Sequence, residues 1–255
     1  MKFIYSCHTD IGTMREVNQD ALVIKNIRQR GHTVLLAAIC DGVGGLNQGE
    51  VTSRKTAEML SDWFDYELPQ IMASDRMDEI IVYRYRQVIA DINKEIYFGN
   101  MRNRISSGTT LSTLLLWDYH YLIGHVGDSR IYSIGEYPRL LTRDHSWVEQ
   151  EIRLGHMTAE EAAEDSRRNV ILKCIGADQD VEPDMLEGNV EEPMVFLLCT
   201  DGFWHYVRGS EWMQYFSPEV AASENVLSSH LYYMTEQVKR RGETDNITAI
   251  AIRIV

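Results

Sequence analysis

Two apolar stretches, VLLAAICDG (residues 34–42) and VFLLCTDG (195–202), share a pattern that organises the whole chain. Each is a run of aliphatic residues that ends on an Asp-Gly pair, so Asp41 and Asp201 stand where the runs end. Short apolar runs bounded by turn signals predict buried strands. An isolated Asp-Gly pair is ordinarily only a turn. Here, however, each pair would hold a carboxylate at the rim of a rigid strand.

Three further aspartates also lie at the ends of predicted strands. Asp20 precedes one strand, Asp245 precedes the last one, and Asp128 lies in a Gly-Asp-Ser-Arg turn between two others. β-Branched and aliphatic alternation predicts strands over 21–27, 32–40, 109–117, 121–126, 130–134, 194–199 and 247–255. Short consecutive strands with brief turns favour antiparallel sheets. We expect a hairpin through Asp118–His120 and a second one through the turn that carries Asp128.

Helical periodicity marks three segments of the chain. The apolar stripes are Thr56, Met59, Leu60, Trp63 and Phe64; Ile81, Tyr85, Val88, Ile92 and Ile96; and Val226, Leu227, His230, Leu231, Met234 and Val238, with Gly242 as a stop signal. Helices grouped between strands indicate an α+β protein. Between residues 144 and 178 the apolar content falls, and two short helices are expected there, the second opened by a capping box at Thr158–Glu161. We expect this segment to form a small surface insertion.

Composition excludes several classes of protein. The 255 residues are 44% hydrophobic, which is enough for a substantial core, and the net charge is −13. The chain has no cluster of Lys and Arg of the kind that grips nucleic acid or anionic lipid. Its start lacks the apolar segment of a signal peptide, and its longest apolar run, Val34–Cys40, is far shorter than the roughly 20 residues that span a bilayer. We therefore expect a cytoplasmic protein with no nucleic-acid or membrane partner. Cys40 and Cys199 lie at the ends of apolar runs, so we expect both to be buried, reduced thiols.

The aspartates at strand ends suggest a metal centre. Carboxylates that converge repel one another, so they require a cationic partner. Oxygen ligands suit Mg²⁺, Mn²⁺ or Ca²⁺, whereas zinc ordinarily takes His or Cys. Two such ions about 3.5–4 Å apart can share a hydroxide and polarise a phosphoryl oxygen. Arg15 lies shortly before Asp20, and a planar guanidinium beside such a centre is well suited to hold a phosphate dianion.

Other catalytic schemes lack their motifs. The sequence contains no Cys-x5-Arg loop of a cysteine phosphatase, no lysine-bearing phosphate loop of a nucleotide-binding enzyme, no HExxH and no Gly-x-Ser-x-Gly.

Taken together, the motifs resemble the protein phosphatase 2C family of metal-dependent phosphatases, in its bacterial form. In family order they are GTMREVNQDA (12–21), AICDGVGG (38–45), SSGTTL (106–111), HVGDSRIY (125–132), LTRDHSWVEQEIRLGHMT (141–158), RRNVILKCIGAD (167–178), LLCTDGFW (197–204) and ETDNITAI (243–250). The resemblance implies an α+β fold of two packed antiparallel β-sheets flanked by helices. It also implies a single catalytic domain over residues 1–255, with a helical flap at about 144–178 that influences substrate choice.

The resemblance also implies an activity and a site. The activity is hydrolysis of phosphoserine and phosphothreonine in proteins by a metal-bridging hydroxide, without a covalent enzyme intermediate. The cofactors are Mn²⁺ or Mg²⁺, as two ions with a third in some members, and the expected partners are phosphorylated proteins and a cognate serine/threonine kinase. The implied roles are a bridging ligand at Asp41, a carbonyl ligand at Gly42, ligands of the other ion at Asp201 and Asp245, a ligand of the third ion at Asp128, phosphate binding at Arg15, and orientation of metal-bound water at Asp20.

Two positions depart from many eukaryotic members of the family. Gln19 replaces a glutamate near the second metal, and Val43 replaces the histidine proposed as general acid, which leaves His145 as an alternative acid. Two other functions stay open: a non-catalytic module of the same fold, and a metal-dependent hydrolase of small phosphate esters. A degenerate module would have lost metal-binding aspartates, whereas this chain keeps them.

Overall fold

The computed structural model describes residues 1–43, 48–190 and 193–255. It contains two five-stranded sheets, ordered β1-β10-β9-β6-β7 and β2-β3-β4-β5-β8. The strands of the first sheet are β1 (Phe3–Asp10), β10 (Ile247–Ile254), β9 (Met194–Cys199), β6 (Arg130–Ile134) and β7 (Pro138–Leu140). Those of the second are β2 (Asp20–Gln29), β3 (His32–Asp41), β4 (Leu111–Trp117), β5 (His120–Val126) and β8 (Asp184–Asn189). Every pairing between these strands is antiparallel, as expected.

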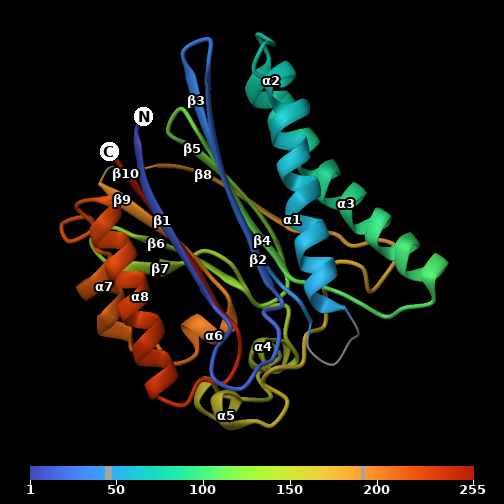
Figure 1. Ribbon diagram of the computed structural model, residues 1–255, viewed down its shortest axis with the longest axis vertical. Coiled ribbons are helices and arrows are strands. Elements are labelled where there is room, and N and C mark those ends of the chain that lie inside the picture. Colours follow the sequence, from blue (N-terminus) through green and yellow to red (C-terminus); the bar gives the residue numbers. More distant parts are fainter. Residues whose placement is uncertain (44–47, 191–192) are drawn as a thin grey trace.

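Helices cover the outer face of each sheet, which gives a four-layered α+β sandwich (Figure 1). The helices are α1 (Gly49–Tyr66), α2 (Leu68–Ile71), α3 (Met77–Asn103), α4 (Trp147–Arg153), α5 (Ala159–Glu164), α6 (Asp201–Trp204), α7 (Gly209–Phe216) and α8 (Glu224–Arg240). In Figure 1, α1 and α3 lie outside the second sheet and α7 and α8 outside the first, while α4 and α5 lie together at one end. The predicted fold class is therefore confirmed. Across the described residues, every helix is too short or too polar to span a lipid bilayer.

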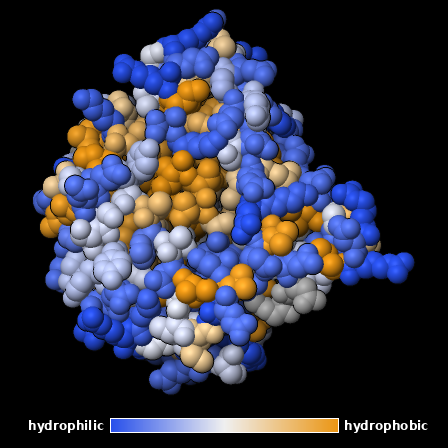
Figure 2. Space-filling model, in the orientation of Figure 1, coloured by the Kyte–Doolittle hydropathy of each residue, from blue (hydrophilic) through white to orange (hydrophobic). Residues whose placement is uncertain are grey.

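Three apolar clusters hold the layers together. One lies between the second sheet and its helices, one between the first sheet and α7 and α8, and one between the two sheets. The sheet-to-sheet cluster explains why β3 and β9 are apolar on both faces, since Leu35 and Phe196 point into it while Leu36 and Leu197 point toward the helices. Figure 2 shows apolar residues gathered between β1 and β2, where the core between the sheets comes nearest to this face. Polar residues surround them in this view.

The three predicted long helices and all seven predicted strands are present. The three predicted stripes lie on α1, α3 and α8, and α8 ends two residues before Gly242, which has a φ of 103°. The hairpin through Asp118–His120 joins β4 to β5. Cys40 and Cys199 are buried free thiols, as predicted. The end of the motif AICDGVGG, residues 44–45, lies outside the described residues.

The second predicted hairpin is wrong. β5 and β6 belong to different sheets, and β6 pairs instead with β7 and β9. The Gly-Asp-Ser turn is therefore a crossover between the sheets. Gly127 permits it because its φ is 114° and because a Cβ at this position would lie 2.6 Å from the Thr110 side chain. The crossover carries Asp128 across the end of the sandwich.

Both short helices predicted in the flap are present as α4 and α5. Ser146 caps α4 by accepting a hydrogen bond from the Glu149 amide, and Thr158 and Glu161 form the predicted capping box of α5. The main chain of His145 anchors the start of the flap, donating to the Gly127 carbonyl at 2.7 Å and accepting from the Leu172 amide at 2.7 Å. The flap is thus tied to the crossover that carries Asp128.

Candidate active site

Asp20 and Asp41 face each other at one end of the second sheet. They are cross-strand partners in the β2–β3 pair. This pairing follows from the alternation in the two strands, because the register that buries their apolar residues also brings both carboxylates to the same end. Thr200 donates a hydrogen bond to Asp20 Oδ2 at 3.0 Å, which links this end of the second sheet to the residue before Asp201 in the first.

Thr110 connects Asp41 to the crossover of Asp128. Its hydroxyl accepts a hydrogen bond from the Asp41 amide at 2.9 Å and lies 2.9 Å from the hydroxyl of Ser129. Its own amide donates to the Asp41 carbonyl at 2.8 Å. Asp128 is held from the other side, where the indole of Trp204 donates to its carbonyl oxygen at 3.2 Å. The backbones of Asp41 and Asp128 are therefore fixed relative to each other.

Asp201 and Asp245 lie close together because the backbone next to each of them approaches another backbone segment at a glycine, where no side chain intervenes. A Cβ on Gly202 would lie 2.1 Å from the carbonyl oxygen of Asn246, and one on Gly12 would lie 2.0 Å from that of Asp245. Asn246 then ties this turn to the N-terminal loop, since its side chain accepts from the Gln19 amide at 2.8 Å and donates to the Ile11 carbonyl at 2.8 Å. Gly42 is also crowded, with a Cβ position 2.6 Å from the backbone of Gly49.

Arg15 lies at the rim of this group. Its guanidinium donates to Asp245 Oδ2 at 2.7 Å, and its side chain is 42% exposed, so it can also reach a ligand from solvent. The hydrogen bond to Asp245 raises the pKa of Arg15, and Asp41 and Asp201 add to the effect. The structure thus brings together all the acidic residues that the sequence singled out, with Arg15 beside them.

The carboxylates perturb one another strongly. Burial raises the pKa of Asp41 well above its ordinary value, and the neighbouring charges of Asp20, Asp201, Asp128 and Asp245 raise it further. Burial likewise raises the pKa of Asp128, with Asp201 as the next cause, and it raises the pKa of Asp20 to about 7. Buried carboxylates that repel one another in this way require a bound cation if they are to stay ionised near neutral pH.

These residues fit divalent metal ions. Oδ1 of Asp20, of Asp128 and of Asp201 is buried without a hydrogen-bond partner among the described residues, and such orphaned oxygens are suitable metal ligands. Among those residues, no three His, Cys, Asp or Glu side chains form a closed shell around one point. Water and substrate oxygens would therefore have to complete the coordination, as they do for Mg²⁺, which keeps several waters.

Comparison with known proteins agrees with this geometry. A family model described as Protein phosphatase 2C matches residues 13–240. The chain belongs to the protein phosphatase 2C family. A relative, the serine/threonine phosphatase Stp of Listeria monocytogenes, is 29% identical over 96% of this chain and 93% of its own length.

Solved structures of phosphatases share the fold of this family member. That of the serine/threonine phosphatase Stp1 from Staphylococcus aureus superposes with a TM-score of 0.85 at 27% identity, covering 100% of this chain and 96% of the other. The catalytic domain of the serine/threonine phosphatase PstP, in complex with two manganese ions, gives a TM-score of 0.80 at 23% identity, covering 99% and 98%. At that lower identity the likeness is one of fold. The expectation of a protein serine/threonine phosphatase of this family is confirmed.

In this phosphatase 2C domain, His145 does not point freely toward the carboxylates. Its Nδ1 accepts a hydrogen bond from the Gly127 amide at 3.0 Å, and its Nε2 lies 3.2 Å from a carboxylate oxygen of Asp184. Burial lowers the pKa of His145, and the charge of Lys173 lowers it further. Both ring nitrogens are therefore engaged, Nδ1 with the crossover and Nε2 with the start of β8, which makes His145 a poor proton donor for a leaving group.

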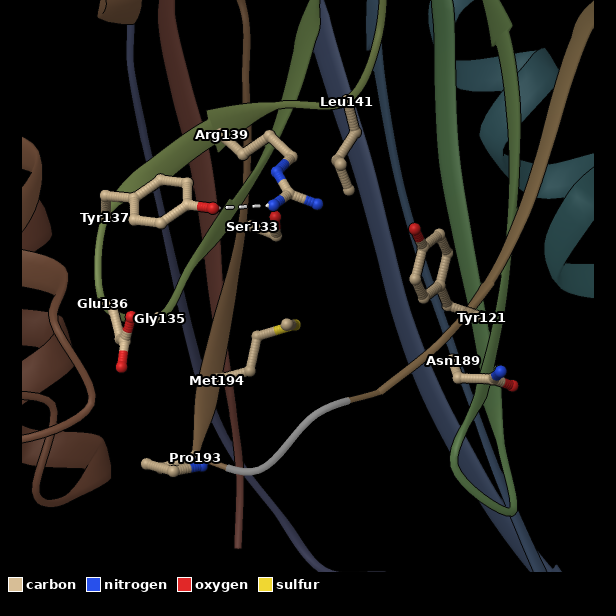
Figure 3. Close-up of a pocket in the computed structure, with 10 residues that line it drawn as sticks. All are labelled: Tyr121, Ser133, Gly135, Glu136, Tyr137, Arg139, Leu141, Asn189, Pro193 and Met194. Atoms are coloured by element: carbon tan, nitrogen blue, oxygen red, sulfur yellow. Dashed lines mark hydrogen bonds between the residues drawn. The ribbon is translucent and has the colours of Figure 1, made fainter.

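Another cavity of the phosphatase lies away from this site. It has a volume of about 330 Å³ and opens between Tyr121 and the β6–β7 hairpin, where Arg139 donates to the hydroxyl of Tyr137 at 3.0 Å (Figure 3). Tyr121 and Met194 lie at the opposite ends of β5 and β9 from the residues that lead to Asp128 and Asp201. This cavity includes none of the clustered aspartates, so it is not the phosphate site.

Several residues that build the site carry no obvious sequence signal. Thr110, Thr200 and Trp204 hold aspartates through hydrogen bonds between segments far apart in the chain. Each lies within a motif quoted above, SSGTTL or LLCTDGFW. A threonine beside an apolar strand is ordinarily a strand residue, so only the three-dimensional pairing identifies its second role.

Proposed function

We propose that this chain hydrolyses phosphoserine and phosphothreonine in proteins, with two Mn²⁺ or Mg²⁺ ions and room for a third. The observation that carries the proposal is the set of aspartates from both sheets that meet beside Arg15 and raise the pKa of Asp41 together. The phosphoprotein specificity follows from relatives such as Stp, whose names describe serine/threonine phosphatases. The same proposal includes a cytoplasmic location, a single catalytic domain over residues 1–255 with the flap at 144–178, and a serine/threonine kinase that acts on the same substrates.

We assign a role at the metal centre to each of these residues. Asp41 would bridge the two ions, the Gly42 carbonyl would bind one, Asp201 and Asp245 would bind the other, and Asp128 would bind the third. When bound, the ions would supply a hydroxide nucleophile and the Lewis acidity that stabilises charge on the phosphoryl group.

The remaining roles belong to the chain itself. Arg15 would hold the phosphate through its planar guanidinium and keep it in line for attack. Asp20, buried and paired with Thr200, would accept a hydrogen bond from water in the centre and so orient it. Val43 has no proton to donate, and His145 is engaged on both nitrogens. The leaving oxygen would therefore take its proton from water.

The proposal is tested by phosphate release from matched peptides that carry phosphoserine, phosphothreonine or phosphotyrosine, with Mn²⁺, with Mg²⁺ and with EDTA. We expect release from the first two peptides with either metal and none in EDTA. Hydrolysis of small phosphate esters without hydrolysis of any phosphopeptide would instead identify a small-ester hydrolase. A folded protein that binds phosphopeptides but releases no phosphate with any metal would identify a non-catalytic module.

A further inference from the structure

A cavity of about 440 Å³ lies between the flap and the end of the sandwich that carries the aspartates. We call it the flap pocket. Its lining includes Val148 and Ile152 of α4, Ala159 and Ala163 of α5, and Asp128 and Trp204 of the sandwich. Because Asp128 belongs both to this lining and to the aspartate cluster, the pocket is continuous with the proposed metal site.

The sandwich side of the flap pocket is rigid and its charges are largely paired. Arg130 donates to both carboxylate oxygens of Asp144, at 3.0 and 2.8 Å, and its guanidinium stacks on the Trp204 ring at 3.3 Å from the ring centroid. The indole nitrogen of Trp204 is in turn bonded to Asp128. On this side a ligand would therefore meet a wall whose arginine, Arg130, is already paired with a carboxylate.

The flap side supplies apolar surface and space. Val148 and Ile152 are partly exposed on α4, and Ala159 and Ala163 are exposed on α5. Alanines at these two positions leave volume that larger side chains would fill, while Ala162 beside them is buried. The caps at Ser146 and Thr158 fix both helix starts, so this wall is held in place as well.

We propose that the flap pocket is a specificity subsite for one large apolar side chain of the phosphoprotein substrate, of the leucine, methionine or phenylalanine class, close in sequence to the phosphorylated residue. The inference rests on the proposed function, because a phosphate held at the aspartate cluster places neighbouring substrate residues at the mouth of the pocket. Charges of both signs line the cavity: Asp128, Glu149, which pairs with Arg143, and Arg168, which donates to the Ala163 carbonyl. The occupant is thus set by the aliphatic wall and not by charge.

The subsite predicts a measurable preference. The test uses a phosphoserine peptide whose other residues are small and neutral. Leucine, glycine or glutamate is placed in turn at each of the three positions before the phosphoserine and each of the three positions after it. At one position we expect kcat/KM for leucine to exceed that for glycine about tenfold or more, which is the scale of discrimination in an apolar pocket. We expect glutamate at that position to fall well below leucine, because its carboxylate would lose water against the apolar wall.

Variants then locate the preference in the flap pocket. Ala163→Phe fills the cavity and should bring the leucine-to-glycine ratio close to one. Glu160→Phe adds the same ring to the same helix at an exposed position that does not line the cavity, and it should keep the wild-type ratio. Because the ratio is taken within each variant, differences in overall turnover cancel. If thermal melting shows that Ala163→Phe does not fold, Ile152→Ala serves instead, and it should lower the ratio several-fold by removing part of the apolar wall.

The results of these assays distinguish failure of the proposed subsite from failure of the proposed function. If wild type hydrolyses all these peptides equally well, the proposed function stands and the subsite is refuted. Equal changes of the ratio in Ala163→Phe and Glu160→Phe would also refute it. If wild type hydrolyses none of the peptides, the proposed function fails and the subsite fails with it.

Discussion

The guanidinium of Arg15 lies 2.7 Å from a carboxylate oxygen of Asp245, although the two residues come from opposite ends of the chain. The contact joins the loop after β1 to the turn before β10, and it places a permanent positive charge at the rim of the aspartate cluster. The carboxylates of Asp245, Asp41 and Asp201 all raise the pKa of Arg15. A phosphate that approached the cluster would therefore meet the arginine as well as the proposed metal ions.

Removal of this guanidinium should weaken both binding and catalysis. A hydrogen bond to a charged group contributes about 1.5–3 kcal/mol, so Arg15→Ala should lower kcat/KM on a phosphoserine peptide about tenfold or more. A higher KM and a lower kcat are both expected, because the phosphate is held in the ground state and in the transition state. Arg76→Ala is the control, since Arg76 pairs with Glu79 on an exposed helix start. Wild-type KM and kcat in Arg15→Ala would place this residue on an ordinary surface.

The close packing at Gly202 predicts a stability effect with a matched control. A Cβ at Gly202 would lie 2.1 Å from the Asn246 carbonyl oxygen, whereas one at Gly209 would meet nothing within 4 Å. Gly202→Ala should therefore lower the free energy of unfolding by about 1–3 kcal/mol or more through overpacking. It should also weaken Mn²⁺ binding, because Asp245 would have to move. Gly209→Ala should be neutral or slightly stabilising. Denaturant unfolding and calorimetric Mn²⁺ titration of both variants check this, and equal stability of the two would contradict it.

The buried Asp20 predicts a pH dependence in the presence of EDTA. Burial raises its pKa from 3.8 to about 7, so between these values the folded chain holds a proton at Asp20 that the unfolded chain has lost. This contribution to stability therefore falls as pH rises through that range. Asp20→Asn keeps a neutral side chain of similar shape at every pH. Its melting temperature relative to wild type should rise between pH 5 and pH 8, and a constant difference would show that Asp20 does not titrate in this range.

Val43 predicts a dependence on the leaving group. A positioned general acid contributes about 10²–10⁴-fold when the leaving group is poor. Because Val43 cannot donate a proton, turnover of aryl phosphates should exceed that of phosphoserine peptides when the chemical step limits kcat. Val43→His should narrow this gap if the loop accepts the ring. His145→Ala should leave the ratio nearly unchanged, because the ring is engaged by Gly127 and Asp184. A selective loss on alkyl phosphates in His145→Ala would identify His145 as the acid.

Much of the fold could be predicted from periodicity because its core elements have strong apolar patterns. β3 and β9 are buried along nearly their whole length, and the stripes of α1, α3 and α8 face the sheets. Three strands, β1, β7 and β8, were not predicted, and each lies at the edge of a sheet. Edge strands are only partly buried, as the pattern of β8 illustrates, so their residues need not be apolar and the periodic signal is weak.

The aspartates of the site could be selected because each follows or precedes a strand. Whether these aspartates converge depends on which sheet each strand joins. The order of strands in a sheet cannot be predicted from local sequence patterns. The error at Gly127 has this cause, since a tight turn between two strands is ordinarily a hairpin, whereas here β5 and β6 join different sheets. The hydrogen bonds of Thr110 and Trp204 could not be predicted for the same reason.

The most direct test of the central claim compares wild type with Asp41→Asn in phosphate release from a phosphoserine peptide as Mn²⁺ is raised to saturation. Asp41 is perturbed by every other aspartate of the cluster, and as the bridging ligand it would contribute to both ions. We predict that Mn²⁺ activates the wild-type protein and that EDTA abolishes its activity. Asp41→Asn should fold but stay nearly inactive at every Mn²⁺ concentration. Turnover close to wild type in Asp41→Asn at saturating Mn²⁺ would contradict the account.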